Sequence, residues 1–346
     1  MEKQQERGSM RFWQVAAGER SRDYSSVFTD FGVMLVGAGD PGPFPGRKSY
    51  YRGHRDWRNQ IVRFAERVNL GDIVVLKKPH GTQWEIVAVG VVKGEYEYLD
   101  LFEDVEGWDL QHCRKVAWVK LPSQIYVKGL SRGTFIEVHN PAIQKKAREL
   151  LKMGESIKAK RLPELPEEVS DEELVDGLVD GGLRAVDAER LVQTIGYVRR
   201  LARWYKDHGC DISEHETRSF LIVPVLLALG WSEQKVKIEW NDLDIAFFPR
   251  AYDKKATKED CIMILESKRM WEGLSYAERQ VKNYQLKFPN CSRLIVSDGV
   301  SYRLYRRKND LWEWEAYLNL LKLKDRHPYY AKIKGALDVF LSLMPA

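Results

Sequence analysis

Three charged residues in the second half of the chain stand in places where apolar strands usually exclude charge. Asp244 lies inside the apolar run LDIAFF (243–248), and Glu266 and Lys268 close the run CIMILESK (261–268). An ionised carboxylate is costly to bury unless a cation neutralises it, and Asp is a poor strand former. Asp244 therefore needs a chemical explanation, whereas Asp242, just outside the apolar run, is expected to be solvated.

The spacing predicts where these side chains meet. Side chains alternate along a strand, so Glu266 and Lys268 share one face and Ser267 points to the other. If the two runs pair as a hairpin, Asp244 and Glu266 converge at one end of the sheet. Two carboxylates repel there unless a divalent cation lies between them, and Mg²⁺ prefers such oxygen ligands. Lys268 on the same face can orient or deprotonate a water molecule that is bound to this cation.

With these residues in place, the second half resembles the PD-(D/E)xK nuclease superfamily. Asp244 followed by the triplet 266–268 matches its motif. Glu216 begins ETRSFLIVPVLLALGW, which is similar to the helix before the catalytic strands in the N-terminal nuclease domain of type I restriction motor subunits. Gln280 and Tyr284 match the QxxxY pair of that subgroup and lie one turn apart on one helix face.

The resemblance extends over about residues 210–306 and ends with CSRLIVSDGVSYRLYR. It departs from the pattern at Leu243, where the family has a dispensable proline. It implies a restriction-endonuclease-like α/β/α core that uses Mg²⁺, with Mn²⁺ as a substitute. It also implies the following roles: Asp244, Glu266 and the Ser267 carbonyl bind metal, Lys268 positions water, Glu216 supports metal or water, and Gln280 and Tyr284 fix Lys268 or the scissile phosphate.

The pattern around these motifs is that of an α/β fold. Helices are predicted at 187–207, 214–229 and 275–288, and strands at 235–240, 243–248, 261–267, 293–297 and 300–305. The first part of the chain is instead rich in strands, at 12–17, 32–37, 72–78, 85–94 and 115–121, with helices at 57–69 and 141–153. Many strands with few helices predict a small, strongly bent sheet or barrel.

Charge and proline mark the boundary between the two parts. Residues 163–189 hold ten acidic residues and one basic residue, a charge of −9, so the rest of the chain carries +14 and the whole chain +5. A basic body around an acidic connector favours a polyanionic partner such as nucleic acid. The predicted organisation is a first domain at 10–145, an acidic helical linker at 146–190 and a second domain at 191–346.

The first domain resembles the EVE/YTH-like members of the PUA superfamily, in particular those that are fused to nuclease domains in modification-dependent restriction enzymes. The stretches that carry this resemblance are FWQVAAGE, GDIVVLKKP, IVAVGVVKGEYEY and HCRKVAWVKL, within about residues 10–140. It implies a PUA-like bent β-barrel that flips a modified base into an aromatic pocket. Trp118, in a strand, is expected in the core.

Candidate contacts follow from residue type. The predicted pocket aromatics lie near strand ends or loops and are Trp13, Trp57, Trp84 and Trp108. The predicted phosphate contacts, which position a duplex without reading it, are Arg52, Arg55, Arg58, Lys77, Lys78, Arg114 and Lys115.

Together these patterns predict a type IV-like restriction endonuclease that cuts double-stranded DNA beside a modified base, by analogy a methylated or hydroxymethylated cytosine. N6-methyladenine also suits an aromatic pocket. One site per chain and two strand cuts imply a homodimer. A non-catalytic reader and an RNA-directed nuclease are the alternatives. Four scattered cysteines without a CxxC pair, no signal-like start and no apolar run of about 20 residues favour a cytoplasmic protein without a membrane partner.

Overall fold

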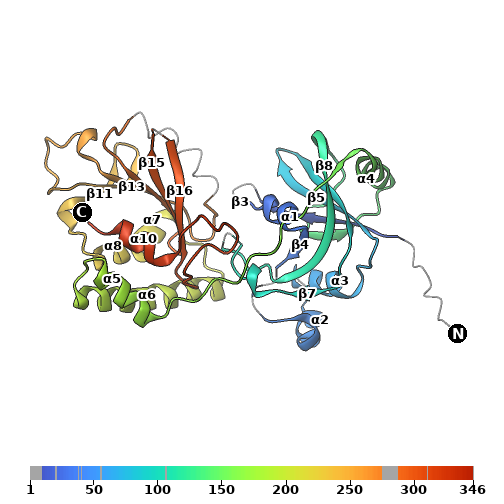
Figure 1. Cartoon of the computed structure of the whole chain (residues 1–346), viewed down its shortest axis with the longest axis horizontal. Helices are drawn as coiled ribbons and strands as arrows, with labels where there is room; N and C mark the ends of the chain where they lie inside the picture. The colour runs from blue at the N-terminus through green and yellow to red at the C-terminus, as the bar shows by residue number, and fades with distance from the viewer. Residues whose placement is uncertain are drawn as a thin grey trace. The chain divides into compact units, whose positions relative to one another are not determined.

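The chain folds as two compact units, residues 1–162 and 163–346, which are described one at a time. The computed structural model describes residues 10–19, 22–37, 39, 41–54, 57–105, 107–274, 287–309 and 311–345 (Figure 1). The predicted linker at 146–190 is divided between the units. Its first residues end a helix of the first unit, and its last residues form helices whose apolar faces pack in the second.

The first unit is built on a curled, half-barrel sheet with strand order β10-β8-β6-β5-β1-β9, in which β4 and β7 also pair with β8. Its strands are β1 (Phe12–Ala16), β2 (Gly18–Glu19), β3 (Arg22–Asp23), β4 (Val33–Val36), β5 (Ile73–His80), β6 (Gln83–Val92), β7 (Glu97–Tyr98), β8 (His112–Val127), β9 (Phe135–Glu137) and β10 (Glu155–Ser156). Its helices are α1 (Ser25–Phe31), α2 (Lys48–Gly53), α3 (Gln60–Glu66) and α4 (Pro141–Met153), with short 3₁₀ turns η1 (Phe44–Gly46), η2 (Trp57–Asn59) and η3 (Asp100–Phe102).

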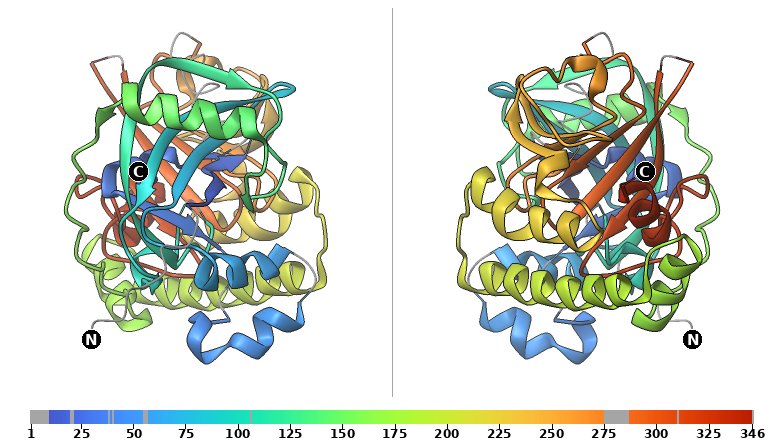
Figure 2. Two further views of the ribbon diagram at one scale, coloured as in Figure 1. Left: turned by 90° about the vertical axis from the view of Figure 1, so that its right-hand side faces the viewer. Right: turned by 90° about the vertical axis from the view of Figure 1, so that its left-hand side faces the viewer.

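Helix α4 covers one face of this curled sheet (Figure 2). Asn140 caps it by accepting a hydrogen bond from the Ala142 N–H, and Pro141 occupies its first position. Ile143, Ala147 and Leu150 recur at helical spacing and pack on sheet residues such as Val75 and Val89. The curl comes from the long strand β8, whose two halves pair with different neighbours.

The second unit has a six-stranded sheet in which the strands follow chain order, β11-β12-β13-β14-β15-β16. All neighbours are antiparallel except β13 and β14, which are parallel. The strands are β11 (Val236–Trp240), β12 (Leu243–Phe247), β13 (Met263–Ser267), β14 (Arg293–Ser297), β15 (Ser301–Lys308) and β16 (Leu311–Asn319). The helical segments are α5 (Asp171–Asp180), α6 (Ala185–His208), α7 (Glu214–Thr217), η4 (Arg218–Ile222), α8 (Val223–Ala228), η5 (Glu233–Lys235), η6 (Lys258–Asp260) and α10 (Ala336–Leu343).

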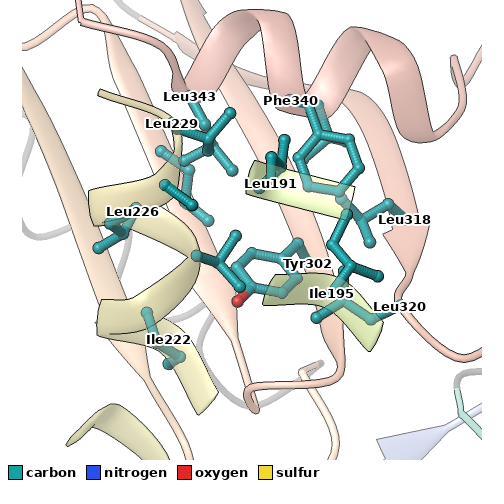
Figure 3. Packing of buried hydrophobic residues seen from close by; sticks show 14 of the residues in the cluster. Leu191, Ile195, Ile222, Leu226, Leu229, Tyr302, Leu318, Leu320, Phe340 and Leu343 are labelled. Carbon is teal, nitrogen blue, oxygen red and sulfur yellow. The ribbon is translucent and has the colours of Figure 1, made fainter. Parts of the chain in front are cut away.

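Alternation along these strands supplies two cores. Ile245 and Leu265 face the helices, whereas Ala246 and Ile264 face the opposite side of the sheet. Figure 3 shows the helical side, where Leu191 and Ile195 of α6, Leu226 of α8 and Phe340 of α10 surround Tyr302 of the sheet. Asp244 and Glu266 continue the side of Ala246 and Ile264, and Ser267 continues the side of Leu265, at the ends of their strands.

The helix predicted at 214–229 is interrupted. Its middle is a π-helical turn in which the Val223 N–H donates to the Arg218 carbonyl. Pro224 explains the interruption because it has no N–H for the Phe220 carbonyl and its ring crowds the preceding turn. Such wide turns often occur at functional sites, and here the turn begins at Arg218.

Candidate active site

Three carboxylates lie on three neighbouring strands at one end of the second sheet. The pairing of Ile238 with Ile245 and of Ile245 with Leu265 fixes the register. Continued by one residue, that register sets Glu239, Asp244 and Glu266 side by side. Glu239 has a positive φ of 53°, and the next two residues, Asn241 and Asp242, form the two-residue hairpin turn. Asp242 is exposed there, as expected for a solvated carboxylate.

Asp244 is held from two sides. Its Oδ2 accepts hydrogen bonds from the Ser267 N–H at 2.7 Å and the Ser267 hydroxyl at 2.9 Å. Its Oδ1 accepts one from the Arg218 guanidinium at 2.7 Å. The expectation that Ser267 contributes at most its carbonyl is therefore wrong. Its hydroxyl lies on the helical side of the strand but reaches Asp244 because both residues lie near the same end of two paired strands.

Glu266 and Lys268 form a buried pair. The Lys268 ammonium donates to Glu266 Oε1 at 2.9 Å, and the two side chains are only 10% and 7% exposed. The predicted shared face of these residues is thus present. A buried ion pair of this kind costs desolvation on both sides, so it is weak evidence for a purely stabilising role.

Helix α7 brings a fourth carboxylate and a second cation. The Glu214 carboxylate lies 3.3 Å from the Ser267 hydroxyl and 3.6 Å from the Arg218 guanidinium. The guanidinium of Arg218, 5% exposed, also donates to the Ser267 hydroxyl at 3.2 Å and to Glu239 at 3.0 Å. Arg218 therefore joins helix α7 to strands β11, β12 and β13.

Glu216 is not in this cluster, which corrects the prediction from its position. Its carboxylate accepts hydrogen bonds from the backbone N–H and hydroxyl of Ser213, both at 2.8 Å, and closes a capping box. These bonds lower the pKa of Glu216. Glu214, instead of Glu216, is the carboxylate that the helix contributes to the cluster. The sequence carried a signal for this exchange, since Ser213 followed three residues later by Glu216 is a capping-box pattern.

The donor chemistry of the cluster fits a hard divalent cation. With His215 neutral, four carboxylates (Glu214, Glu239, Asp244 and Glu266) meet two cations (Arg218 and Lys268), a formal surplus of two negative charges. Burial raises the pKa of Glu214, and Asp244 and Glu266 raise it further against the opposing effects of Lys268 and Arg218. Among the described residues, however, no three acidic, histidine or cysteine side chains are placed to hold a metal ion. Arg218 and Lys268 bridge the carboxylates instead.

Two predicted site residues, Gln280 and Tyr284, lie outside the described residues. The parallel pairing of β13 with β14 requires a crossover connection between Lys268 and Ser292. Gln280 and Tyr284 belong to this connection in the sequence. Their predicted roles stay predictions.

The tryptophans predicted to line a base pocket do not share one environment. Trp13 is fully buried because its strand β1 lies between β5 and β9. Its indole N–H donates to Asp72 at 2.8 Å and its ring stacks on Phe135, so its assignment to an open pocket is wrong. The buried Lys77 ammonium lies over the ring of Trp84, 3.5 Å from the ring centroid.

Trp108 is 42% exposed and lies under the Arg22 guanidinium at 5.0 Å. The side chain of Trp57 lies outside the described part of the chain. Trp118 is buried and its indole N–H donates to the Val33 carbonyl at 3.0 Å, as expected for a core residue.

Two of the predicted phosphate contacts are structural. Arg114 is buried and its guanidinium donates to the carbonyls of Phe64 and Ala65 at 3.0 and 2.8 Å. Lys77 is buried and donates to the Ser131 carbonyl, and burial lowers the pKa of its ammonium to about 7. Both point inward because their strand positions face the core, so neither is available to a phosphate.

The other basic candidates are at the surface but already have partners. Arg52 pairs with Glu66 at 2.6 Å, and Lys78 pairs with Asp23 at 3.3 Å. The remaining two are Arg58, 3.1 Å from the His54 ring nitrogen, and Lys115, 3.6 Å from Glu97. Arg55 lies outside the described residues. Their phosphate contacts stay predictions.

The sequence reading missed an aromatic network around His112. Its ring nitrogens lie 3.1 Å from the Tyr51 hydroxyl and 2.8 Å from the Tyr96 hydroxyl. Ring contacts extend this network to Phe44, Tyr50, Phe64 and Tyr98. Tyr50, which is 39% exposed, brings it to the surface.

Within the described residues, no helix has the length and apolar character to cross a membrane.

Comparisons with known proteins cover only part of the chain. A family model described as "Domain of unknown function (DUF8426)" matches residues 13–137, less than half of the chain. No curated protein matches the chain. Among solved structures, the chain is similar to the YTH domain of the Zygosaccharomyces rouxii MRB1 protein in complex with N6-methyladenosine RNA. The identity is 16%, the TM-score is 0.27, and the match covers 43% of this chain and 90% of that chain. A TM-score this low carries no argument about fold or ligand.

Proposed function

We propose that the second unit is a Mg²⁺-dependent endonuclease and that the first unit directs it to a modified base. The observation that supports this most is the convergence of Asp244, Glu266 and Lys268 at one end of the second sheet, with Glu214 added from a helix. Sequence positions separated by more than 50 residues meet there in a cluster with surplus negative charge. Charged groups brought together in this way are typical of functional sites.

Each residue of the cluster has a definable role in phosphodiester hydrolysis. Asp244, Glu266 and Glu214 would have to draw closer together to hold a divalent ion, which would supply Lewis-acid stabilisation of the phosphate when bound. Lys268, kept near Glu266, places a positive charge where negative charge develops and orients the attacking water. Arg218 holds Asp244 and Glu239 in place and neutralises them before a metal ion arrives.

The first unit would act as the reader. Exposed aromatic rings such as Tyr50 and Trp108 can stack on a flipped base, and a methyl group adds apolar contact. On the resemblance of this unit to EVE/YTH-like domains, we propose modified cytosine in double-stranded DNA as the target. Two strand cuts by one site per chain require two copies, so the active form would be a homodimer.

Digestion of plasmid DNA in the presence of Mg²⁺ tests the nuclease assignment. The wild-type protein should cut methylated plasmid, and Lys268→Ala should not, while circular dichroism shows that the variant is folded. Equal cutting by both proteins, or no cutting by the wild type on any substrate, would sink the assignment.

A panel of substrates tests the reader assignment in the same assay. Duplexes with 5-methylcytosine, 5-hydroxymethylcytosine or N6-methyladenine should be compared with unmodified DNA and with structured RNA. We expect modified DNA to be cut fastest. Equal cleavage of modified and unmodified DNA would show that the protein does not recognise a modified base. Faster cleavage of RNA would show that RNA, and not DNA, is the substrate.

A further inference from the structure

Helix α6 of the second unit carries aromatic residues on the face that should be polar. Its core-facing side is formed by residues such as Leu191, Ile195 and Val198. The opposite side carries Tyr197 and Trp204, which are 47% and 50% exposed. Surface helices usually present charged residues on that side, so two large exposed rings on one face of a helix need an explanation.

These rings lie in a line with basic side chains. Helical spacing of three and four residues places Arg190, Tyr197, Arg200, Trp204 and His208 on one face, called here the α6 stripe. Tyr197 and Trp204 are two turns apart, about 10 Å, with Arg200 between them. The stripe therefore alternates aromatic and basic groups along the helix.

Some arginines of α6 form ion pairs or hydrogen bonds within the fold, whereas others have no carboxylate nearby among the described residues. Arg190 pairs with Asp187 at 3.3 Å, and Arg199 donates to the Leu320 carbonyl at 2.5 Å. Within the described part of the chain, no carboxylate lies within 4.0 Å of the guanidinium of Arg200 or Arg203, both of which are exposed. Unpaired guanidinium groups beside open aromatic rings suit an anionic, aromatic ligand.

One face of Trp204 is already supported. The His208 ring stacks on it, with ring centroids 4.5 Å apart and planes at 24°. The His208 Nδ1 lies 2.8 Å from the Trp204 carbonyl, which fixes the imidazole in this position. A supported ring that is half exposed is a platform for a further planar group.

The C-terminal end of α6 lies near the candidate active site through contacts made outside the stripe. Lys206 lies over the Trp271 ring at 5.3 Å, and Asp211, just after the helix, pairs with Arg269 at 3.6 Å. Both contacts tie the end of α6 to the residues that follow Lys268. Five residues after His208, Ser213 caps the helix that carries Glu214.

We propose that the α6 stripe binds an unpaired stretch of DNA strand next to the cleavage site. This inference rests on the proposed nuclease function. Base stacking on Trp204 and Tyr197 requires unpaired bases because paired bases expose no ring face. Arg200 and Arg203 would contact the phosphates between them. A second copy of the chain docked stripe against stripe is disfavoured as the occupant because it would bring the same basic groups together.

Binding measured in EDTA tests this proposal separately from cleavage. Fluorescence anisotropy with fluorescein-labelled oligothymidylate should show that Trp204→Ala weakens binding by roughly tenfold, the usual effect of losing one stacked base. Trp204→Phe should restore most of the affinity. Leu311→Ala, which removes another exposed apolar side chain of this unit, should bind as the wild type does.

Salt dependence tests the role of the guanidinium group. Arg200→Ala should reduce the slope of log affinity against log salt by about 0.7, the value for one phosphate contact on a single strand. The matched control Arg326→Ala, whose arginine pairs with Asp325, should leave the slope unchanged.

Three outcomes would overturn the proposal. They are unchanged oligothymidylate binding by Trp204→Ala, equal weakening by Trp204→Phe and Trp204→Ala, and conversion of a dimer to a monomer by Trp204→Ala with strand affinity unaltered. If strand binding behaves as expected but no substrate is cut, the proposed nuclease function fails and the strand-binding surface stands.

Discussion

The cluster around Asp244 and the network around His112 are both dense sets of polar groups, but they differ in how far their bonding capacity is used. In the first unit, the Tyr51 hydroxyl donates to the Gly42 carbonyl at 2.7 Å, so it must accept from His112 Nε2–H. His112 Nδ1 then accepts from the Tyr96 hydroxyl, which itself accepts from the Phe44 N–H at 2.9 Å. The hydrogens of the Tyr51 hydroxyl, the His112 Nε2 and the Tyr96 hydroxyl therefore each have an acceptor.

The cluster of the second unit is not closed in this way. Four carboxylates share two cations, and burial raises the pKa of Glu214. Charge of one sign accumulates there, whereas burial raises the pKa of Tyr96, so its hydroxyl stays protonated as a donor to His112. A network whose groups satisfy one another stabilises a fold, while a cluster with surplus charge is prepared for a ligand.

The largest expected effect on stability comes from breaking the buried pair of the second unit. Lys268→Ala removes the ammonium that donates to the buried Glu266 carboxylate and should lower the free energy of unfolding by about 3–5 kcal/mol. Urea unfolding would measure it. The control Lys78→Ala removes a surface lysine that pairs with Asp23 and should cost less than about 1 kcal/mol. Equal losses in the two variants would show that the cluster does not bury charge as described.

Magnesium should stabilise the second unit. A ligand at 100 times its dissociation constant adds about 2.7 kcal/mol to the free energy of unfolding, so Mg²⁺ should raise the urea midpoint of the wild-type protein. Asp244→Asn should abolish the increase, whereas Tyr51→Phe should keep it. An increase that persists in Asp244→Asn would place metal binding elsewhere.

Opening the closed network should be costly without affecting the cluster. Tyr51→Phe removes the donor to the Gly42 carbonyl and the acceptor of the His112 N–H, and should cost about 1–3 kcal/mol of stability. Cleavage in the plasmid assay should be unchanged once the protein is folded. Loss of cleavage at full stability would mean that this network takes part in function.

The smallest effect concerns the pH dependence of stability. Because folding raises the pKa of Glu214 above its ordinary value of 4.5, its stabilising contribution is present below that value and is lost as the pH rises through the raised pKa. The side chain of Glu214→Gln cannot ionise, so the variant does not lose this stability as the pH rises. It should therefore be more stable than the wild type at neutral pH but not in acid. The side chain is 35% exposed, so the gain should stay below about 1 kcal/mol.

Urea midpoints at pH 4 and pH 7 in the absence of metal would measure this difference. The variant should at the same time bind Mg²⁺ more weakly, since it lacks one carboxylate. A variant that is less stable than the wild type at neutral pH would contradict the assignment of surplus charge.

The comparison also shows which parts of the molecule sequence patterns can predict. The charged residues at the ends of β12 and β13 were predictable because apolar strands exclude unpaired charge, and the shared face of Glu266 and Lys268 followed from alternation. The role of Arg218 was not predictable, since it depends on the π-helical turn that Pro224 causes. Helices α1, α2 and α10 and strand β16 were also not predicted.

In the first unit, residue type was a poor guide to position. Trp13, Lys77 and Arg114 were assigned to ligand contacts because aromatic and basic residues suit nucleic acid, but all three are buried. Whether such a residue faces the core or the surface depends on the register and neighbours of its strand, which composition does not specify.

The most direct test of the central claim is single-turnover cleavage of an end-labelled, methylated duplex with Mg²⁺. We predict that the wild type cuts the duplex, that Asp244→Asn cuts it at least about 100-fold more slowly, and that Glu216→Gln, altered only in the capping box, cuts it at nearly the wild-type rate. Cleavage by Asp244→Asn at the wild-type rate would contradict the account.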